Sequence, residues 1–270
     1  METSLSDLHI QELTTAVELL ENPSMAAKIT NVIGMPIEKA IGFLPDNWQD
    51  NIGKITQKSL IKATEAAIWS IDDKHVEKPS NLWHKFGVAL SGGVGGFFGL
   101  PGLAIELPLS TTIMLRSIAD VARSQGESLS DYETKLACME VFALGGESTS
   151  DDDAESGYFV VRAALANSIT EATRFVATKK ISEESAPALV KFIVNVAARF
   201  NVLVTEKAAA QAIPAIGAVG GGIINTLFID HFQDVAKGHF IVRRLERLYS
   251  PEIVKTWYNA ILDLKYEEQD

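Results

Sequence analysis

The chain contains little cysteine and comparatively little positive charge. Cys138 is the only cysteine among 270 residues, so neither an internal disulfide nor a cysteine-rich zinc cluster can form. Lysine and arginine number 24 against 35 acidic residues, which gives a formal net charge of −11. Because such a chain repels nucleic-acid phosphates, no nucleic-acid partner is expected. Residues 1–7 have no basic or apolar segment, so no secretory signal is expected.

Strand signals are also scarce, and helical periodicity dominates. Hydrophobic residues make up 47% of the chain and charged residues 22%, as in a folded globular protein. Apolar side chains recur every three to four residues over 52–71, which predicts a helix there. A capping-box pattern at 130–133 predicts a helix to about Leu144, and Pro251 begins the last one. The sequence therefore predicts an all-α multi-helix bundle with two glycine-rich apolar helical hairpins.

One compositional boundary divides the chain. Residues 147–156 are acidic, small and polar, which is typical of a solvated linker. We therefore expect N-terminal helices over 1–80, a first glycine-rich helical half over 81–146, the acidic linker, and a second glycine-rich helical half over 157–270. A single domain comprising all of these parts is the alternative.

Two long stretches carry no charge, at 86–105 and 208–229. Each is about as long as a helix that crosses a bilayer. Small residues recur every four positions within them, which lets two helix backbones approach closely. The glycines expected at helix-packing or membrane-contact positions are Gly92, Gly95, Gly96, Gly99, Gly217 and Gly221. Burial in a helical core and contact with a membrane both account for this pattern, and the two hypotheses remain open.

Polar side chains interrupt or border these stretches. Glu106 has apolar neighbours on both sides, so its carboxylate needs a partner or a proton, and Ser110 and Arg116 are the candidates near it in sequence. Pro108 predicts a kink beside Glu106. The expected buried polar network consists of Glu106, Arg116, Asp120, Arg123 and Asn225.

The densest group of metal-capable side chains lies at 230–239. Asp230 and Asp234 lie one helical turn apart, with His231 between them. The candidate ligands of a divalent metal are Glu106, Asp230, His231, Asp234 and His239. No cofactor other than this metal is predicted, and no catalytic serine motif is present, so the catalytic residues stay unassigned. The basic run at 243–247 is expected to pair with the acidic residues before it or to contact anionic lipid head groups.

Three segments together resemble the EcsC protein family. They are residues 99–123, residues 136–146 and residues 198–246, and the resemblance covers roughly 83–247. It implies a bacterial, mainly helical protein that is cytoplasmic or membrane-associated. Some family members are described as peptidases, but the resemblance supplies no catalytic positions to transfer to this chain.

Three functional hypotheses follow. The first is a membrane-associated helical interaction or accessory protein, located in the cytoplasm and peripheral to or inserted in the inner membrane, whose partner is a membrane surface or a membrane protein. The second is a metal-dependent, peptidase-like hydrolase that uses the candidate metal ligands. The third is a carrier of an apolar ligand or lipid, bound between the glycine-rich layers. The sequence does not specify an oligomeric state.

Overall fold

The computed structural model describes residues 5–21, 25–70, 99–146, 157–178, 187–213 and 217–267. These residues form ten helices and no strand, so the predicted all-α fold is confirmed. The helices are α1 (Asp7–Leu20), α2 (Met25–Ile33), α3 (Ile37–Ile41), α4 (Trp48–Ser70), α6 (Gly99–Ser124), α7 (Tyr132–Leu144), α8 (Gly157–Thr178), α9 (Pro187–Gln211), α10 (Gly217–Leu248) and α11 (Pro251–Glu267). The predicted linker at 147–156 and the glycines Gly92, Gly95 and Gly96 lie outside the described residues.

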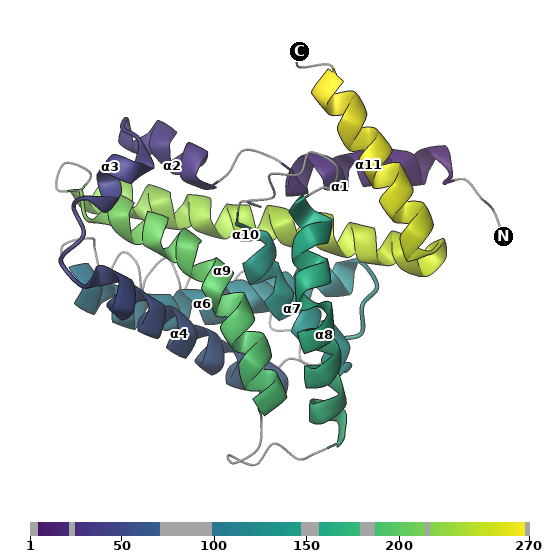
Figure 1. The fold of residues 1–270 in the computed structure, drawn as a ribbon, viewed down its shortest axis with the longest axis horizontal. Coiled ribbons are helices and arrows are strands. Elements are labelled where there is room, and N and C mark those ends of the chain that lie inside the picture. The colour runs from purple at the N-terminus through teal and green to yellow at the C-terminus, as the bar shows by residue number, and fades with distance from the viewer. Residues whose placement is uncertain are drawn as a thin grey trace.

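The longest helix, α10, runs across the molecule and contacts helices from every part of the chain (Figure 1). Helices α4 and α6 pack side by side, α6 also packs on α10, and α9 contacts both α4 and α10. Helices α7 and α8 lie toward the C-terminal half of α10, on the side of the molecule where α11 follows it. The helices assigned by sequence to the N-terminal part and to the two halves therefore pack on one another, around one shared cluster of buried apolar side chains.

Aromatic rings fill the centre of this core. Phe142 of α7, Phe200 of α9, and Phe228 and Phe232 of α10 are all fully buried. Phe142 lies 4.9 Å from Phe200 and 5.3 Å from Phe232, measured between ring centroids. Tilted and edge-to-face ring pairs of this kind each add about 0.5–1.5 kcal/mol to the stabilisation from area burial alone. The aromatic contacts thus join three helices that are distant in sequence.

Helix α1 runs antiparallel along the second half of α10. A Cβ atom added at Gly238 would lie 2.7 Å from Leu20 Cγ and 3.1 Å from the carbonyl oxygen of Ala16, so glycine permits the close approach of the two helices. Farther along, Arg244 pairs with Glu12 at 2.8 Å. This packing fixes the part of α10 that carries most of the charged residues described below.

The second uncharged stretch, 208–229, includes the end of one long helix and the start of another. Helix α9 ends at Gln211 and α10 begins at Gly217, with Pro214 between them. Of the first uncharged stretch, residues 99–105 are described, and they form the start of α6. Helix α6 continues through Pro108 to Ser124. The runs of β-branched residues inside 187–211 belong to helix α9, because helical burial on several sides overrides their local strand preference.

Candidate functional site

A buried ion pair joins the start of α6 to the end of α9. Lys207 Nζ lies 2.8 Å and 3.1 Å from the two carboxylate oxygens of Glu106, and the lysine and glutamate side chains are 1% and 9% exposed. The ammonium group also lies 4.7 Å from the centroid of the Phe228 ring. The expectation that Glu106 pairs with Ser110 or Arg116 is wrong: the Ser110 hydroxyl donates to the Leu107 carbonyl, and the cation comes from another helix.

A second polar contact ties α9 to α10 at the same end. Gln211 Nε2 donates to Asn225 Oδ1 at 3.1 Å, and Asn225 is buried as predicted. Because Glu106 directly follows the first uncharged stretch and Asn225 lies within the second, these contacts bring the described parts of the two stretches together at one end of the bundle. We call this region the uncharged end, and it comprises residues 102–109, 208–213 and 222–229.

Apolar side chains of the uncharged end are exposed. Ile105 is 70% exposed, and Leu109 and Ile223 are each 47% exposed. At Gly222 no described atom lies within 4 Å of the position that a Cβ would occupy. In the described part of the chain, one helix, α9, is long and apolar enough to cross a membrane, and half of its apolar window is buried, as in an ordinary core helix.

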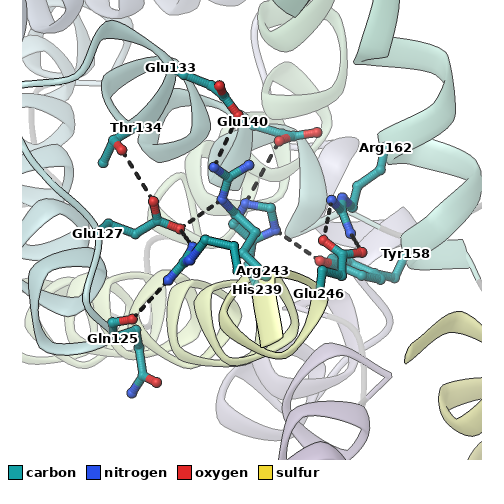
Figure 2. Close-up of polar contacts among 11 residues, drawn as sticks. Gln125, Glu127, Glu133, Thr134, Glu140, Tyr158, Arg162, His239, Arg243 and Glu246 are labelled. Carbon is teal, nitrogen blue, oxygen red and sulfur yellow. Dashed lines mark hydrogen bonds and ion pairs between the residues drawn. The ribbon is translucent and has the colours of Figure 1, made fainter. Parts of the chain in front are cut away.

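A large polar cluster surrounds the second half of α10 (Figure 2). Its members come from the α6–α7 connection, α7, α8 and α10, and they point toward one another. The polar cluster consists of Gln125, Glu127, Glu133, Thr134, Glu140, Tyr158, Arg162, His239, Arg243, Glu246 and Arg247.

Glu127 is the most heavily bonded acid of the cluster. Arg243 Nε donates to its carboxylate at 3.0 Å, Arg247 also pairs with it, and the Thr134 hydroxyl donates at 3.2 Å. Burial by itself favours the neutral acid, but the hydrogen bonds and positive charges of Arg243 and Arg247 outweigh it and lower the pKa of Glu127. Glu127 is therefore an ionised anchor between the α6–α7 connection and α10.

Arg162 and Glu246 form a bidentate pair between α8 and α10. The two guanidinium nitrogens lie 2.7 Å and 3.0 Å from the two carboxylate oxygens. The guanidinium also lies 5.3 Å from the centroid of the Tyr158 ring. Parallel N–H···O bonds of this type fix geometry as well as charge.

The innermost part of the cluster is a row of three residues, Tyr158, His239 and Glu140. A 3.0 Å hydrogen bond joins the Tyr158 hydroxyl to His239 Nδ1, and His239 Nε2 lies 3.7 Å from Glu140 Oε2. Burial raises the pKa of the Glu140 carboxyl to about 7, although Arg162 and Arg243 act against this shift. Burial, with the same two arginines, holds the pKa of His239 well below its usual value.

The five candidate metal ligands do not converge. Glu106 is paired with Lys207, while His231 Nε2 donates to the Gly145 carbonyl at 2.7 Å. Asp230 is exposed and Asp234 half-buried, and His239 belongs to the polar cluster. Among the residues the structure describes, no group of three or more histidine, cysteine, aspartate or glutamate side chains is placed to hold a metal ion.

Other predicted polar residues have local or unexpected partners. Arg123 pairs with Asp120 at 3.1 Å within α6, as the helical spacing predicts, and Arg116 is half-buried on the same helix. The arginines at 243–247 do not pair with the acidic residues just before them in α10. Their acidic partners are Glu12, Glu127 and Glu133, because the packing of α1 and α7 on α10 brings those carboxylates closer.

Sequence reasoning missed several members of the polar cluster, although a signal was present. Glu140 lies inside the apolar run 136–144, and Arg162 follows four apolar or aromatic residues at 158–161. This isolation of a charge among apolar neighbours is the pattern that singled out Glu106. The pairing of these residues depends on how α7, α8 and α10 meet, which local sequence does not determine.

Comparison with known proteins yields one family. No curated protein and no solved structure matches the chain. The profile of the EcsC protein family matches residues 7–245 of 270, a range that includes the uncharged end and nearly all of the polar cluster. The bundle that carries these two regions therefore belongs to the EcsC protein family.

Proposed function

We propose that this protein is a membrane-associated accessory protein whose uncharged end inserts among lipid acyl chains. The observation that supports this most strongly is the exposure of Ile105, Leu109 and Ile223 where the two uncharged stretches meet. Exposed apolar side chains grouped beside a long uncharged sequence are typical of surfaces that bind a membrane or a protein.

The scarcity of charged residues at the uncharged end favours lipid over a protein partner. Protein interfaces usually have a polar, solvent-accessible rim, whereas the interior of a bilayer excludes charge. Residues 208–229 contain no charged residue at all. The one charged residue within the uncharged end, Glu106, is paired with Lys207, which directly precedes residue 208, and both side chains are buried. An end built in this way is suited to an environment without water.

Gly222 provides independent support. A glycine within a helix in water costs about 1 kcal/mol relative to alanine. At Gly238 of the same helix a close helix contact explains the glycine, whereas at Gly222 no described atom is near enough to require it. Close approach of an acyl chain or of another membrane helix would account for a glycine at this position.

The pairing of the α10 arginines distinguishes apolar insertion from electrostatic binding to anionic head groups. Arg243, Arg244 and Arg247 all form ion pairs within the protein, and the chain has a net charge of −11. Electrostatic attraction to anionic head groups is therefore not the driving force. Binding should depend on apolar insertion, so it should persist on zwitterionic vesicles and at high salt.

Vesicle flotation tests the proposal. The full chain should float with phosphatidylcholine vesicles, and Ile105→Asp or Ile223→Asp should lower the bound fraction at least about tenfold, because each change removes an exposed apolar side chain that would insert among acyl chains and adds a charge. Leu264→Asp is the matched control: Leu264 is 62% exposed but lies on α11, beyond the far end of α10. It should leave flotation unchanged.

Two results would contradict the proposal. One is a failure of the unmodified chain to float with vesicles of any lipid composition. The other is an equal loss of flotation in the Ile105→Asp and Leu264→Asp variants, since binding would then not be localised to the uncharged end. Circular dichroism of each variant verifies that the helical fold is retained.

A further inference from the structure

The row Tyr158–His239–Glu140 contains two ionisable groups whose geometry does not fit an ion pair. His239 is 0% exposed, and its Nε2 has no hydrogen-bond partner. The nearest acid atom, Glu140 Oε2, lies 3.7 Å away. A charged imidazolium facing a buried carboxylate would close this gap to about 2.7–2.9 Å. At 3.7 Å neither a hydrogen bond nor a close ion pair joins the two groups, so the geometry does not support opposite charges on both of them.

The surrounding charges are balanced without Glu140. Arg162 of α8 pairs with Glu246 of α10, and Arg243 and Arg247 of α10 are paired with Glu127 and Glu133. Three arginines thus face three carboxylates. The charges that act on Glu140 itself are those of Arg162, Arg243 and Glu246. An ionised Glu140 would be a fourth carboxylate beside these three arginines, and the described charges that act on it include no further cation.

The other helices packed near this row contribute groups of a different kind. From α11, Tyr258 stacks on Tyr158, and its hydroxyl donates a hydrogen bond to the Glu21 carboxylate at 2.8 Å. From α9, Phe200 packs against Phe142 of α7. From α4, the Thr64 hydroxyl contacts the sulfur of Met139, the residue before Glu140. Within α7, Cys138 is a buried thiol whose pKa is raised by burial. None of these contacts brings a cation to Glu140.

We propose that Glu140 and His239 together bind one proton inside the bundle, that the proton resides on the Glu140 carboxyl, and that it is released to solvent as the surroundings become alkaline. The site goes beyond the proposed membrane association and does not depend on it. Loss of the proton leaves a negative charge at the junction of α7, α8 and α10. The packing of these three helices on one another is therefore sensitive to pH.

The contributions of Glu140 and His239 to folding stability change in opposite directions with pH. The pKa of Glu140 rises on folding from its ordinary 4.5 to about 7, so its contribution to stability is complete below pH 4.5 and is lost as the pH rises to about 7. The pKa of His239 falls on folding from its ordinary 6.5, so its contribution is complete above pH 6.5 and is lost as the pH falls. Between these ordinary values the folded and unfolded pairs each hold one proton, on the carboxyl and on the imidazole respectively, so the two slopes cancel.

Nuclear magnetic resonance of the unmodified chain tests the proposal directly. One glutamate side-chain carboxyl signal should titrate with a midpoint near pH 7, and the His239 ring nitrogens should show a neutral imidazole at pH 6. The signal should vanish in Glu140→Gln and persist in Glu133→Gln, a matched change at a carboxylate that is 64% exposed on the same helix. A Glu140 midpoint near 4.5, or an imidazolium at His239 at pH 6, would overturn the proposal.

Stability measurements on the single variants provide a second test. In His239→Gln, the His239 contribution that opposes that of Glu140 is gone, so the unfolding equilibrium constant relative to the unmodified chain should increase by up to about 100-fold between pH 4.5 and 6.5. In Glu140→Gln, the relative constant should instead increase as the pH falls from about 7 to 4.5. Equal pH slopes in both variants and the unmodified chain would overturn the proposal, and where a variant does not fold the resonance titration of the unmodified chain decides.

Discussion

The two halves of helix α10 differ in how many charged residues they carry and in how those charges are paired. Residues 217–229 carry no charge, and they include the exposed Ile223 and Gly222, where no described atom lies within 4 Å of the position of an added Cβ. Residues 230–248 carry three arginines that pair with acids from α1, the α6–α7 connection and α7. At the uncharged end one lysine neutralises one glutamate, whereas in the polar cluster Glu127 accepts from three residues, Arg243, Arg247 and Thr134. The second half is therefore tolerant of single losses, and the first half is not.

Removing Lys207 should produce the largest effect on stability. Lys207→Met would leave the Glu106 carboxylate buried with no cation and should lower the free energy of unfolding by about 3–5 kcal/mol. Arg243→Met is the comparison in the polar cluster. It leaves Glu127 bonded to Arg247 and Thr134, so the loss should be about half as large or less. Urea denaturation of the two variants measures both values.

The double variant Glu106→Met with Lys207→Met completes this comparison. Replacing both members of a buried ion pair by apolar side chains of similar size is often neutral or stabilising. Most of the stability lost in Lys207→Met should therefore return. If Lys207→Met cost no more than Arg243→Met, the distinction between one unsupported pair and a redundant cluster would not hold.

The two glycines of α10 should respond to alanine in opposite directions. In Gly238→Ala the new Cβ would clash with Leu20 and with the Ala16 carbonyl, so α1 must shift, at a cost of about 1–3 kcal/mol. In Gly222→Ala no described atom opposes the Cβ, and the better helix propensity of alanine should stabilise the isolated protein by about 0.5–1 kcal/mol.

Thermal unfolding of both variants without lipid measures these effects, and vesicle flotation of Gly222→Ala extends the comparison. If a lipid chain or another helix packs closely at Gly222, the variant should be more stable in solution but weaker in binding. Stabilisation with unchanged flotation would mean that Gly222 is not a contact point of the uncharged end.

Acid should weaken the polar cluster through Glu127. Its pKa is lowered on folding from the ordinary 4.5, so its contribution to stability is present above pH 4.5 and is lost as the pH falls through the lower folded value. Glu127→Gln should therefore be less stable than the unmodified chain at pH 7, and the difference should shrink below pH 4.5. A difference that stayed constant down to pH 3 would show that Glu127 is not held ionised by its arginines.

The sequence predicted helices well and their polar partners poorly, for a physical reason. Periodicity and caps are local, so the helix ending at Leu144 and the one starting at Pro251 were predictable from a few neighbouring residues. Ion pairs such as Glu106–Lys207 join residues a hundred positions apart, and the partner depends on how helices cross. The need of Glu106 for a partner was evident from its apolar neighbours, but which cation reaches it was not.

The same reasoning explains the unmet metal prediction at 230–239. Spacing along a helix places Asp230 and Asp234 one turn apart. It does not reveal that the Gly145 carbonyl, just after α7, accepts a hydrogen bond from His231. Likewise, Nδ1 of His239 is hydrogen-bonded to the Tyr158 hydroxyl. Both histidines are thus engaged by groups from other helices, and their side chains do not face a common point with the aspartates.

The smallest effect is expected at a pair that belongs to neither region. Lys191 of α9 and Glu171 of α8 are 3.7 Å apart, with side chains 63% and 54% exposed. Water and salt screen such a pair, so Lys191→Met should change the free energy of unfolding by less than about 0.5 kcal/mol and should leave vesicle flotation unaltered. This variant removes one lysine–glutamate contact, as Lys207→Met does, and differs from it chiefly in burial. A loss approaching that of Lys207→Met would mean that removing a lysine, rather than stranding a buried carboxylate, controls stability in this bundle.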